Sequence, residues 1–446
     1  MNSADKFSRK SWTALLIFGL IGQIAWSVEN MYFNLFVFEE VAENLSAITL
    51  MVQLSGIVAT VSTLVFGTLS DKLGNRRTFI SVGYIIWGIT VGLYGFLSPE
   101  NMAKLFSVDG VRAVGITLAI VIIGDCVMTL FGSASNDAAF NAWVTDNTRP
   151  AFRGKVEGIL AILPLVAMLI VAGGFGILAE AFGSYAYLFL FLGIFITLAG
   201  ILGLFIIKDS PTLRPSGSFK DIFFGFRPSA VRENKPLYVT FLLVLVYGIA
   251  AQVFMPYLII YMKSYLGFSV VEYSVVFGAA ILVGAGVNAY LGALSDRHSK
   301  PRLMYIAAAV MAAGLFLMYL SRGMSHGATL VLFGISGFVM ITGYIFVTAL
   351  SGSVIRDFTP PSEAGKLQGV RMIFSVLLPM VFGPMIGNAI NRAKNIPLPD
   401  AGADAMTTAY IPAPEIFLVG GAITLILFAL IPLLVKISKK DSNVDL

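Results

Sequence analysis

The segment Gly67-Thr-Leu-Ser-Asp-Lys72 recurs with two changes as Gly292-Ala-Leu-Ser-Asp-Arg297. Each copy closes the second long apolar run of its half of the chain. A second pair of segments, 146–158 and 357–369, aligns without gaps, and six of its thirteen positions are identical. Two matches at equivalent places predict an internally duplicated protein, and secondary transporters commonly combine such repeats with a binding site where the repeats meet.

The composition predicts that the chain lies in a membrane. Of its 446 residues, 57% are hydrophobic and 12% are charged, whereas a soluble domain carries about 25% charged residues. The apolar residues fall into runs of about 20, the length of a helix that crosses a hydrocarbon layer of about 30 Å. In lipid, backbone polar groups must be satisfied within their own segment, so we expect these runs to be helices.

The predicted fold is an all-α membrane protein of twelve transmembrane helices in two pseudo-symmetric bundles of six. We expect the N-terminal bundle at 1–207, a linker on the inner face at 208–236 and the C-terminal bundle at 237–446. The predicted spans are 12–38, 46–69, 78–97, 113–137, 158–180, 185–207, 237–262, 273–294, 302–321, 328–350, 369–390 and 415–435.

Basic residues are distributed unequally between the two sides of these spans. The connections on the side of the N-terminus hold 24 of the 30 Lys and Arg residues, and the opposite side holds the remaining six. By the positive-inside rule, this asymmetry places both termini in the cytoplasm and the helices in the cytoplasmic membrane. It also explains the net charge of +5 without a nucleic-acid partner.

The first copy of the repeated segment, extended to Gly67-x-Leu-x-Asp71-Lys-x-Gly-x-Arg76-Arg77, resembles the inner-loop signature of the major facilitator superfamily. The resemblance covers essentially the whole chain, and in that family the acid of this loop helps to hold the two bundles together on the cytoplasmic side. It therefore implies a cytoplasmic gate made of Gly67, Asp71, Arg76, Arg77, Asp146, Arg153, Asp296, Arg297 and Asp357.

Around Trp26, Glu29 and Asn30, and again at Asn141–Asp146, the sequence is similar to the sugar–cation symporters, the branch of the glycoside-pentoside-hexuronide and sucrose-type transporters. One departure is the span 46–69, which has no carboxylate where the melibiose carrier of that branch has acids of its cation site. The resemblance therefore does not extend to sodium coupling of that kind. The segment Gly173–Gly176 also lacks the proline that proton-coupled drug antiporters carry there.

Two acidic residues, Glu29 and Asp125, lie deep in predicted spans, and no Lys or Arg lies in the central turns of any span. An ionised carboxylate at that depth costs several kcal/mol, so each acid should carry a proton or hold a cation for part of a transport cycle. We therefore predict that these two residues couple transport to a proton or another cation. The alternative is that each is a neutral acid, hydrogen-bonded between helices.

Polar residues accompany both acids at helical spacing. Gln23, Trp26, Asn30 and Asn34 share a stripe with Glu29 at its edge, and Thr129 and Asn136 share one with Asp125. Because polar stripes avoid lipid, we expect both to line the substrate path, where the indole ring and the amides suit a sugar or an organic cation. The second half offers Gln252, Tyr257 and Tyr344; core packing or structural hydrogen bonding remains the alternative for all of these residues.

The sequence carries no signature of an enzyme. It has no Gly-rich phosphate loop with Lys and Ser or Thr, and its two histidines and one cysteine form no metal-ligand cluster. We expect no cofactor, a small-molecule solute and a coupling ion as partners in the lipid bilayer, and a monomer. Three hypotheses remain: a cation-coupled importer of a sugar or similar polar solute, an exporter of a drug or metabolite, and a receptor or lipid-handling protein on the same scaffold.

Overall fold

The structure, a computed structural model, describes residues 9–148, 150–211, 213–215, 219–295, 299–360, 364–398 and 409–441. Among these residues, eleven helical spans are long and apolar enough to cross a membrane. The twelfth predicted span, 273–294, falls on α14 (Val270–Ser295), whose described apolar part is Val270–Gly284. The predicted all-α fold of twelve membrane helices is confirmed.

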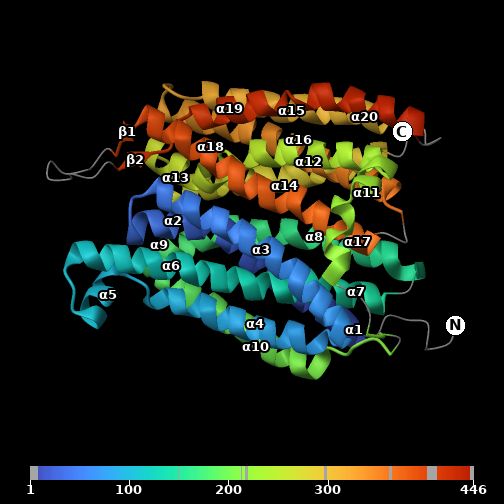
Figure 1. Cartoon of the computed structure of the whole chain (residues 1–446). Helices are drawn as coiled ribbons and strands as arrows, with labels where there is room; N and C mark the ends of the chain where they lie inside the picture. The colour runs from blue at the N-terminus through green and yellow to red at the C-terminus, as the bar shows by residue number, and fades with distance from the viewer. Residues whose placement is uncertain are drawn as a thin grey trace. The chain divides into compact units, whose positions relative to one another are not determined.

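Several spans are built from more than one helical element, and Figure 1 labels the main ones. The α-helices are α1 (Arg9–Val28), α2 (Asn34–Phe36), α3 (Leu45–Leu73), α4 (Arg77–Leu93), α5 (Pro99–Phe106), α6 (Gly110–Gly132), α7 (Asn141–Asn147), α8 (Pro150–Ile170), α9 (Gly176–Phe182), α10 (Ala186–Ile206), α11 (Pro228–Glu233), α12 (Lys235–Gln252), α13 (Leu258–Ile260), α14, α15 (Lys300–Leu320), α16 (His326–Phe358), α17 (Ala364–Met372), α18 (Leu378–Lys394), α19 (Glu415–Thr424) and α20 (Leu427–Asp441). Two short strands, β1 (Ile396–Pro397) and β2 (Tyr410–Ile411), pair antiparallel.

Short π-helical segments interrupt several spans. Two of them matter for the site: η2 (Glu29–Phe33), between α1 and α2, and η5 (Ser133–Phe140), between α6 and α7. The fourth span is therefore one continuous helix, Gly110–Asn147, which extends ten residues beyond the predicted end at 137. Hydropathy detects only the apolar part of such a helix, because polar residues after it keep the same backbone hydrogen bonding.

The described chain packs as two compact units. The first contains Met1–Ala42 and Ile57–Phe219, and the second contains Glu43–Gly56 and Lys220–Leu446. The start of α3 thus packs with the C-terminal half of the chain. Within this second unit, Thr49 Oγ1 lies 2.7 Å from the Tyr257 hydroxyl, and Gln53 Nε2 donates to the Val381 carbonyl over 2.9 Å.

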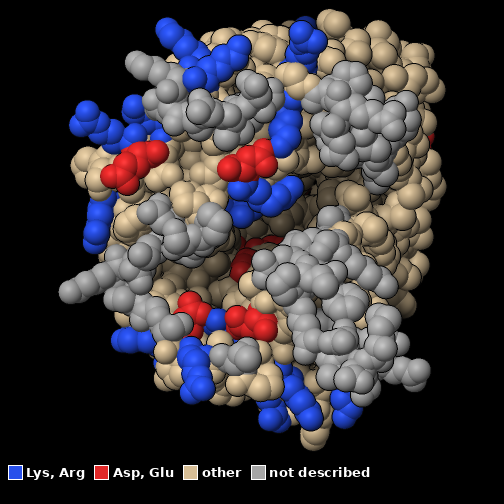
Figure 2. Space-filling view, turned by 90° about the vertical axis from the view of Figure 1, so that its right-hand side faces the viewer, with Lys and Arg blue, Asp and Glu red and all other residues tan. Residues whose placement is uncertain are grey.

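Many Lys and Arg side chains are visible on the face drawn in Figure 2, and in each unit basic residues lie at one end of the helices. In the first unit this end carries Lys72, Arg76 and Arg77 between α3 and α4, and in the second it carries Lys300 and Arg302 at the start of α15. Along the middle of the helices, apolar side chains remain exposed, for example Phe191 (60%) and Leu198 (57%) on α10. This is the pattern of helices whose outer faces meet lipid.

Glycines allow α4 and α10 to pack closely in the first unit. A Cβ atom on Gly193 would lie 2.5 Å from the Gly92 nitrogen and 2.6 Å from the Gly88 carbonyl oxygen. Both neighbours are backbone atoms, so neither can move aside as a side chain could. Small residues at such crossings are typical of membrane helices, since lipid supplies no hydrophobic force to bring helices together.

We expect the Gly193→Ala variant to be destabilised by about 1–3 kcal/mol, because the added methyl group overpacks this crossing. The readout is thermal unfolding of the purified protein in detergent. Gly115→Ala is the matched control, since a Cβ atom at this glycine of another membrane helix would meet nothing within 4 Å. Equal unfolding temperatures for the two variants would contradict the packing account.

Candidate functional site

Three carboxylates of the first unit lie close together. Glu29 opens η2, Asp125 lies in α6 and Asp137 lies in η5. Glu29 interacts electrostatically with both of the other acids. Thr129 Oγ1 donates a hydrogen bond to Glu29 Oε1 over 3.1 Å, whereas Glu29 Oε2 is buried and accepts none from the described residues.

This acid cluster, Glu29, Asp125 and Asp137, is largely shielded from solvent. Asp125 is 2% exposed and the other two acids are half-buried. Tyr94 also lies near Glu29 and Asp125, and its hydroxyl donates to the Val121 carbonyl over 2.9 Å. No Lys, Arg or His is among the groups that act electrostatically on Glu29 in the described chain.

Asp137 is absent from the predicted site because the apolar run ends at that residue. The small and polar sequence from Ser133 to Asn141 resembles a loop in hydropathy, yet it continues the helix as η5. The available signal was the lack of Pro or of a glycine run in this stretch. Hydrogen bonds from i to i+5 are rare, and π-helical turns often occur at functional sites.

Aromatic rings lie beside the acid cluster. The ring centroids of Trp26 and Trp87 are 5.1 Å apart. A Cβ atom on Gly132 would lie 2.9 Å from Trp87 and 3.0 Å from Trp26, so the missing side chain makes room for both indoles. The Trp26 indole also interacts with Asp137, although its Nε1 completes no hydrogen bond of normal geometry with a described residue.

The other predicted residues of the first span, in α1, η2 and α2, differ in exposure. Gln23 is half-buried, Asn30 is exposed, and Asn34 is 4% exposed. Asn30 Nδ2 donates to the Trp26 carbonyl over 2.7 Å. Because a π turn holds more residues than an α turn, the predicted stripe does not continue from Asn30 to Asn34 with α-helical spacing.

Asn136 is held between two helices of the first unit. Its Nδ2 donates to the Tyr84 hydroxyl over 2.6 Å, and this hydroxyl in turn donates to the Phe18 carbonyl over 2.7 Å. A Cβ atom on Gly22 would lie 1.8 Å from Asn136 Nδ2, so a glycine is required where the amide crosses α1. The predicted contact of Asn136 with substrate stays a prediction.

The predicted residues of the second unit lie among packed helices. The Tyr257 hydroxyl donates to the Pro384 carbonyl over 2.9 Å and also contacts Thr49. Gln252 is half-buried, and a Cβ atom on Gly383 would lie 2.3 Å from the Gln252 Cβ atom. Tyr344 packs edge-on against Tyr247, with ring centroids 6.0 Å apart.

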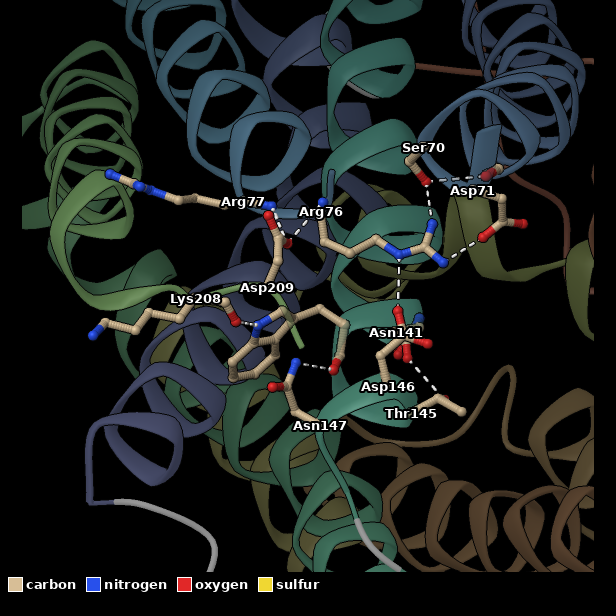
Figure 3. Close-up of polar contacts among 12 residues, drawn as sticks. Ser70, Asp71, Arg76, Arg77, Asn141, Thr145, Asp146, Asn147, Lys208 and Asp209 are labelled. Carbon is tan, nitrogen blue, oxygen red and sulfur yellow. Dashed lines mark hydrogen bonds and ion pairs between the residues drawn. The ribbon is translucent and has the colours of Figure 1, made fainter. Parts of the chain in front are cut away.

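The predicted gate residues of the first unit form one polar network around Arg76, which is 4% exposed (Figure 3). Its Nε donates to Asp146 Oδ2 over 3.0 Å, and its Nη1 donates to Ser70 Oγ over 2.6 Å. Its Nη2 pairs with Asp71. One guanidinium group therefore joins the end of α3, the start of α4 and the end of α7.

Asp209, which follows α10, completes this network and was not among the predicted residues. Its Oδ1 accepts the backbone N–H groups of Arg76 over 2.8 Å and Arg77 over 3.0 Å at the start of α4. A carboxylate is stabilised there by the free N–H groups and the positive end of the helix dipole. Next to Asp209, the Lys208 carbonyl accepts from Trp143 Nε1 over 2.8 Å, which fixes the same segment to α7.

The remaining gate residues are placed as follows. The Asp357 carboxylate forms a salt bridge with Lys300, and both residues belong to the second unit. Gly67 lies in α3, where a Cβ atom would be 3.7 Å from the Ala138 Cβ atom. Asp296, Arg297 and the side chain of Arg153 lie outside the described residues. Asp71 is bonded within its own unit, and its role in holding two bundles together stays a prediction.

The sequence profile described as the Major Facilitator Superfamily matches residues 12–384 and 240–445. The chain belongs to the major facilitator superfamily. It is therefore a multi-pass membrane transporter and not an enzyme, in agreement with the sequence prediction.

Solved structures of this superfamily share the fold. The nucleoside transporter NupG has a TM-score of 0.67 at 12% identity, over 94% of this chain and 98% of that chain. A bacterial homologue of the human lysosomal transporter Spinster, in an inward-facing and unoccupied conformation, has a TM-score of 0.67 at 14% identity, over 98% of this chain and 100% of that chain. Identities this low show the fold alone. No curated protein matches the sequence.

We expect Arg76→Ala to lower the stability of the protein by about 1–3 kcal/mol, because Asp146 and Ser70 lose a buried donor. The measurement is thermal unfolding in detergent. Arg112→Ala is the matched control: Arg112 pairs with Asp109 over 3.8 Å, and both side chains are more than half exposed. An exposed pair of this kind contributes less than about 1 kcal/mol, so an equal loss in both variants would refute a special role of Arg76.

Proposed function

We propose that the chain is a secondary active transporter that moves a small polar solute, a sugar or glycoside, across the cytoplasmic membrane by alternating access, coupled to protons or another cation. The observation that carries this proposal is the acid cluster, in which a buried Glu29 oxygen accepts no hydrogen bond from the described residues. Such an oxygen is available to a proton or a cation, and a transporter needs a group of this kind to couple its cycle to an ion gradient.

The charge of the cluster supports coupling to a cation. Asp125 and Asp137 each repel Glu29 when the carboxylates are ionised, and no Lys, Arg or His is among the groups that act on Glu29 in the described chain. Proton or cation binding relieves this repulsion, so occupancy of the cluster changes the free energy of the conformation that holds it.

The surroundings of the cluster support a polar, ring-shaped solute. Trp26 is half-buried, and its indole face can stack on the apolar face of a sugar ring, whereas Trp87 is fully buried and supports Trp26 from behind. Gln23 of α1 and Asn30 of η2 supply amide donors and acceptors for hydroxyl groups. A site of this kind combines apolar walls with a few placed polar groups, as small-molecule sites generally do.

The distribution of basic side chains supports an orientation. In each unit, basic side chains lie at one end of the helices: Lys72, Arg76 and Arg77 in the first unit, and Lys300 and Arg302 in the second. By the positive-inside rule we assign this end, the network around Arg76 and both termini to the cytoplasm. The membrane is then the cytoplasmic membrane, as the sequence predicts.

We expect Asp125→Asn and Glu29→Gln to abolish uphill accumulation while solute binding or exchange continues, because the amides keep the size of the acids but cannot bind a proton reversibly. The measurement is gradient-driven uptake into proteoliposomes of labelled disaccharides, methyl glycosides and nucleosides, with a proton gradient or a sodium gradient. Asp109→Asn is the control, because Asp109 is exposed and caps the same helix as Asp125, and asparagine caps equally well.

Concentrative uptake by Asp125→Asn at the wild-type level would reject the coupling role. The same assay separates the alternatives. Solute efflux from the vesicles that is driven by an imposed inward proton gradient would show an exporter. Solute binding without any flux would show a receptor.

A further inference from the structure

A pocket of about 250 Å³ lies in the second unit, between α12, α16 and α17. Its walls are Phe241, Ile355, Arg356, Thr359, Leu367, Gln368 and Arg371. None of these residues belongs to the acid cluster or to the network around Arg76. The pocket is therefore separate from the residues to which the coupling and gate roles are assigned above.

Two guanidinium groups face this pocket without a counter-charge from the described residues. Arg356 and Arg371 form no salt bridge there, and the adjacent carboxylate of Asp357 is engaged by Lys300. The electrostatic neighbours of the Arg371 side chain are Arg356 and the Tyr247 hydroxyl. Both side chains are exposed, so solvent screens their mutual repulsion, and an anion bound between them would be attracted by two positive charges.

The donors at the pocket match a phosphate group. A guanidinium group presents paired N–H donors, whose geometry fits two oxygens of a phosphate. Two arginines supply a charge of about +2, which balances the charge of about −1.5 to −2 on a phosphate monoester at neutral pH. Gln368 adds an amide donor, while the Thr359 hydroxyl already donates to the Ile355 carbonyl over 2.6 Å.

The size of the pocket limits the ligand. Small-molecule sites usually enclose about 300–1,000 Å³, so a pocket of about 250 Å³ holds a phosphate group with only a small body attached. Phe241, Ile355 and Leu367 provide an apolar wall on which such a body can rest. The phosphate could belong to a soluble ester or to a lipid headgroup, which offers the same chemistry.

We propose that Arg356 and Arg371 form a binding site for a phosphate group, with Gln368 as a third donor. The site goes beyond the proposed coupling and substrate residues and lies in the other unit of the protein. It is the place in the second unit where an anionic solute, or the phosphate of a lipid, would be held.

The test uses the full-length protein in detergent. Isothermal titration calorimetry measures the affinity for inorganic phosphate and for glucose 6-phosphate, with glucose as the uncharged comparison. A parallel arm measures how much phosphatidylglycerol, compared with phosphatidylcholine, stays bound in native mass spectrometry. The variants are Arg356→Gln, Arg371→Gln and Arg371→Lys, with Arg302→Gln as the matched control, since Arg302 is an exposed arginine of the same unit that does not line the pocket.

We expect each Gln variant to weaken phosphate binding about tenfold or more, because a charge-assisted hydrogen bond is lost. Arg371→Lys should retain part of the affinity, since the charge remains without the paired donors. Arg302→Gln should bind as the wild type does. Arginine-dependent binding of the soluble phosphates assigns the site to a soluble ester, and arginine-dependent retention of phosphatidylglycerol alone assigns it to a lipid; both results support the site.

The proposal is overturned if neither the soluble phosphates nor phosphatidylglycerol binds in a way that depends on Arg356 and Arg371. It is also overturned if Arg302→Gln loses as much affinity as the pocket variants. Size-exclusion profiles and unfolding temperatures identify a variant that has failed to fold. If a Gln variant fails to fold, Arg371→Lys still tests the site, because lysine keeps the positive charge and removes only the paired donors. Because the acid cluster is unchanged in every variant, failure here would leave the coupling proposal intact.

Discussion

The hydrocarbon layer solvates neither backbone polar groups nor charges, and this constraint governs both the fold and the site. It requires helices that satisfy their own backbone, and it leaves apolar side chains exposed on outer faces such as that of α10. It also makes any buried charge expensive, so the described charges concentrate at the helix ends. The exceptions are Glu29, Asp125 and Asp137, which belong to one unit and interact electrostatically through Glu29. Their cost in the membrane is the reason for proposing a functional role for them.

One continuous helix links the acid cluster to the polar network at the end of the unit. The span Gly110–Asn147 carries Asp125 and Asp137, and then Asp146, which binds the Arg76 guanidinium. The π-helical segment η5 lies between these points. π-helical turns often occur at functional sites, and this one continues the backbone from the acids to the residue that binds Arg76.

The two units differ in the charge of the groups to which roles are proposed. The first holds carboxylates beside indole rings, and the second holds a guanidinium pair beside apolar side chains. Such an asymmetry is notable in a chain whose halves share repeated segments. Different side chains can thus give each unit its own chemistry, as is general for functions built on common folds.

The sequence by itself determined the membrane helices, their number and the superfamily, because hydropathy and the loop motif are local properties. It also brought Asp71, Arg76 and Asp146 into one predicted group, since the motif places them at adjoining helix ends. Only the tertiary structure decided that Asp137 joins Glu29 and Asp125, that Asp209 binds the start of α4, and that Arg371 faces a pocket with Arg356. These contacts depend on the rotation of each helix about its axis and on π turns that shift the helical register. Neither can be read from the spacing of apolar residues in the sequence. For the same reason, the packing of Glu43–Gly56 with the second unit could be found only in the folded chain.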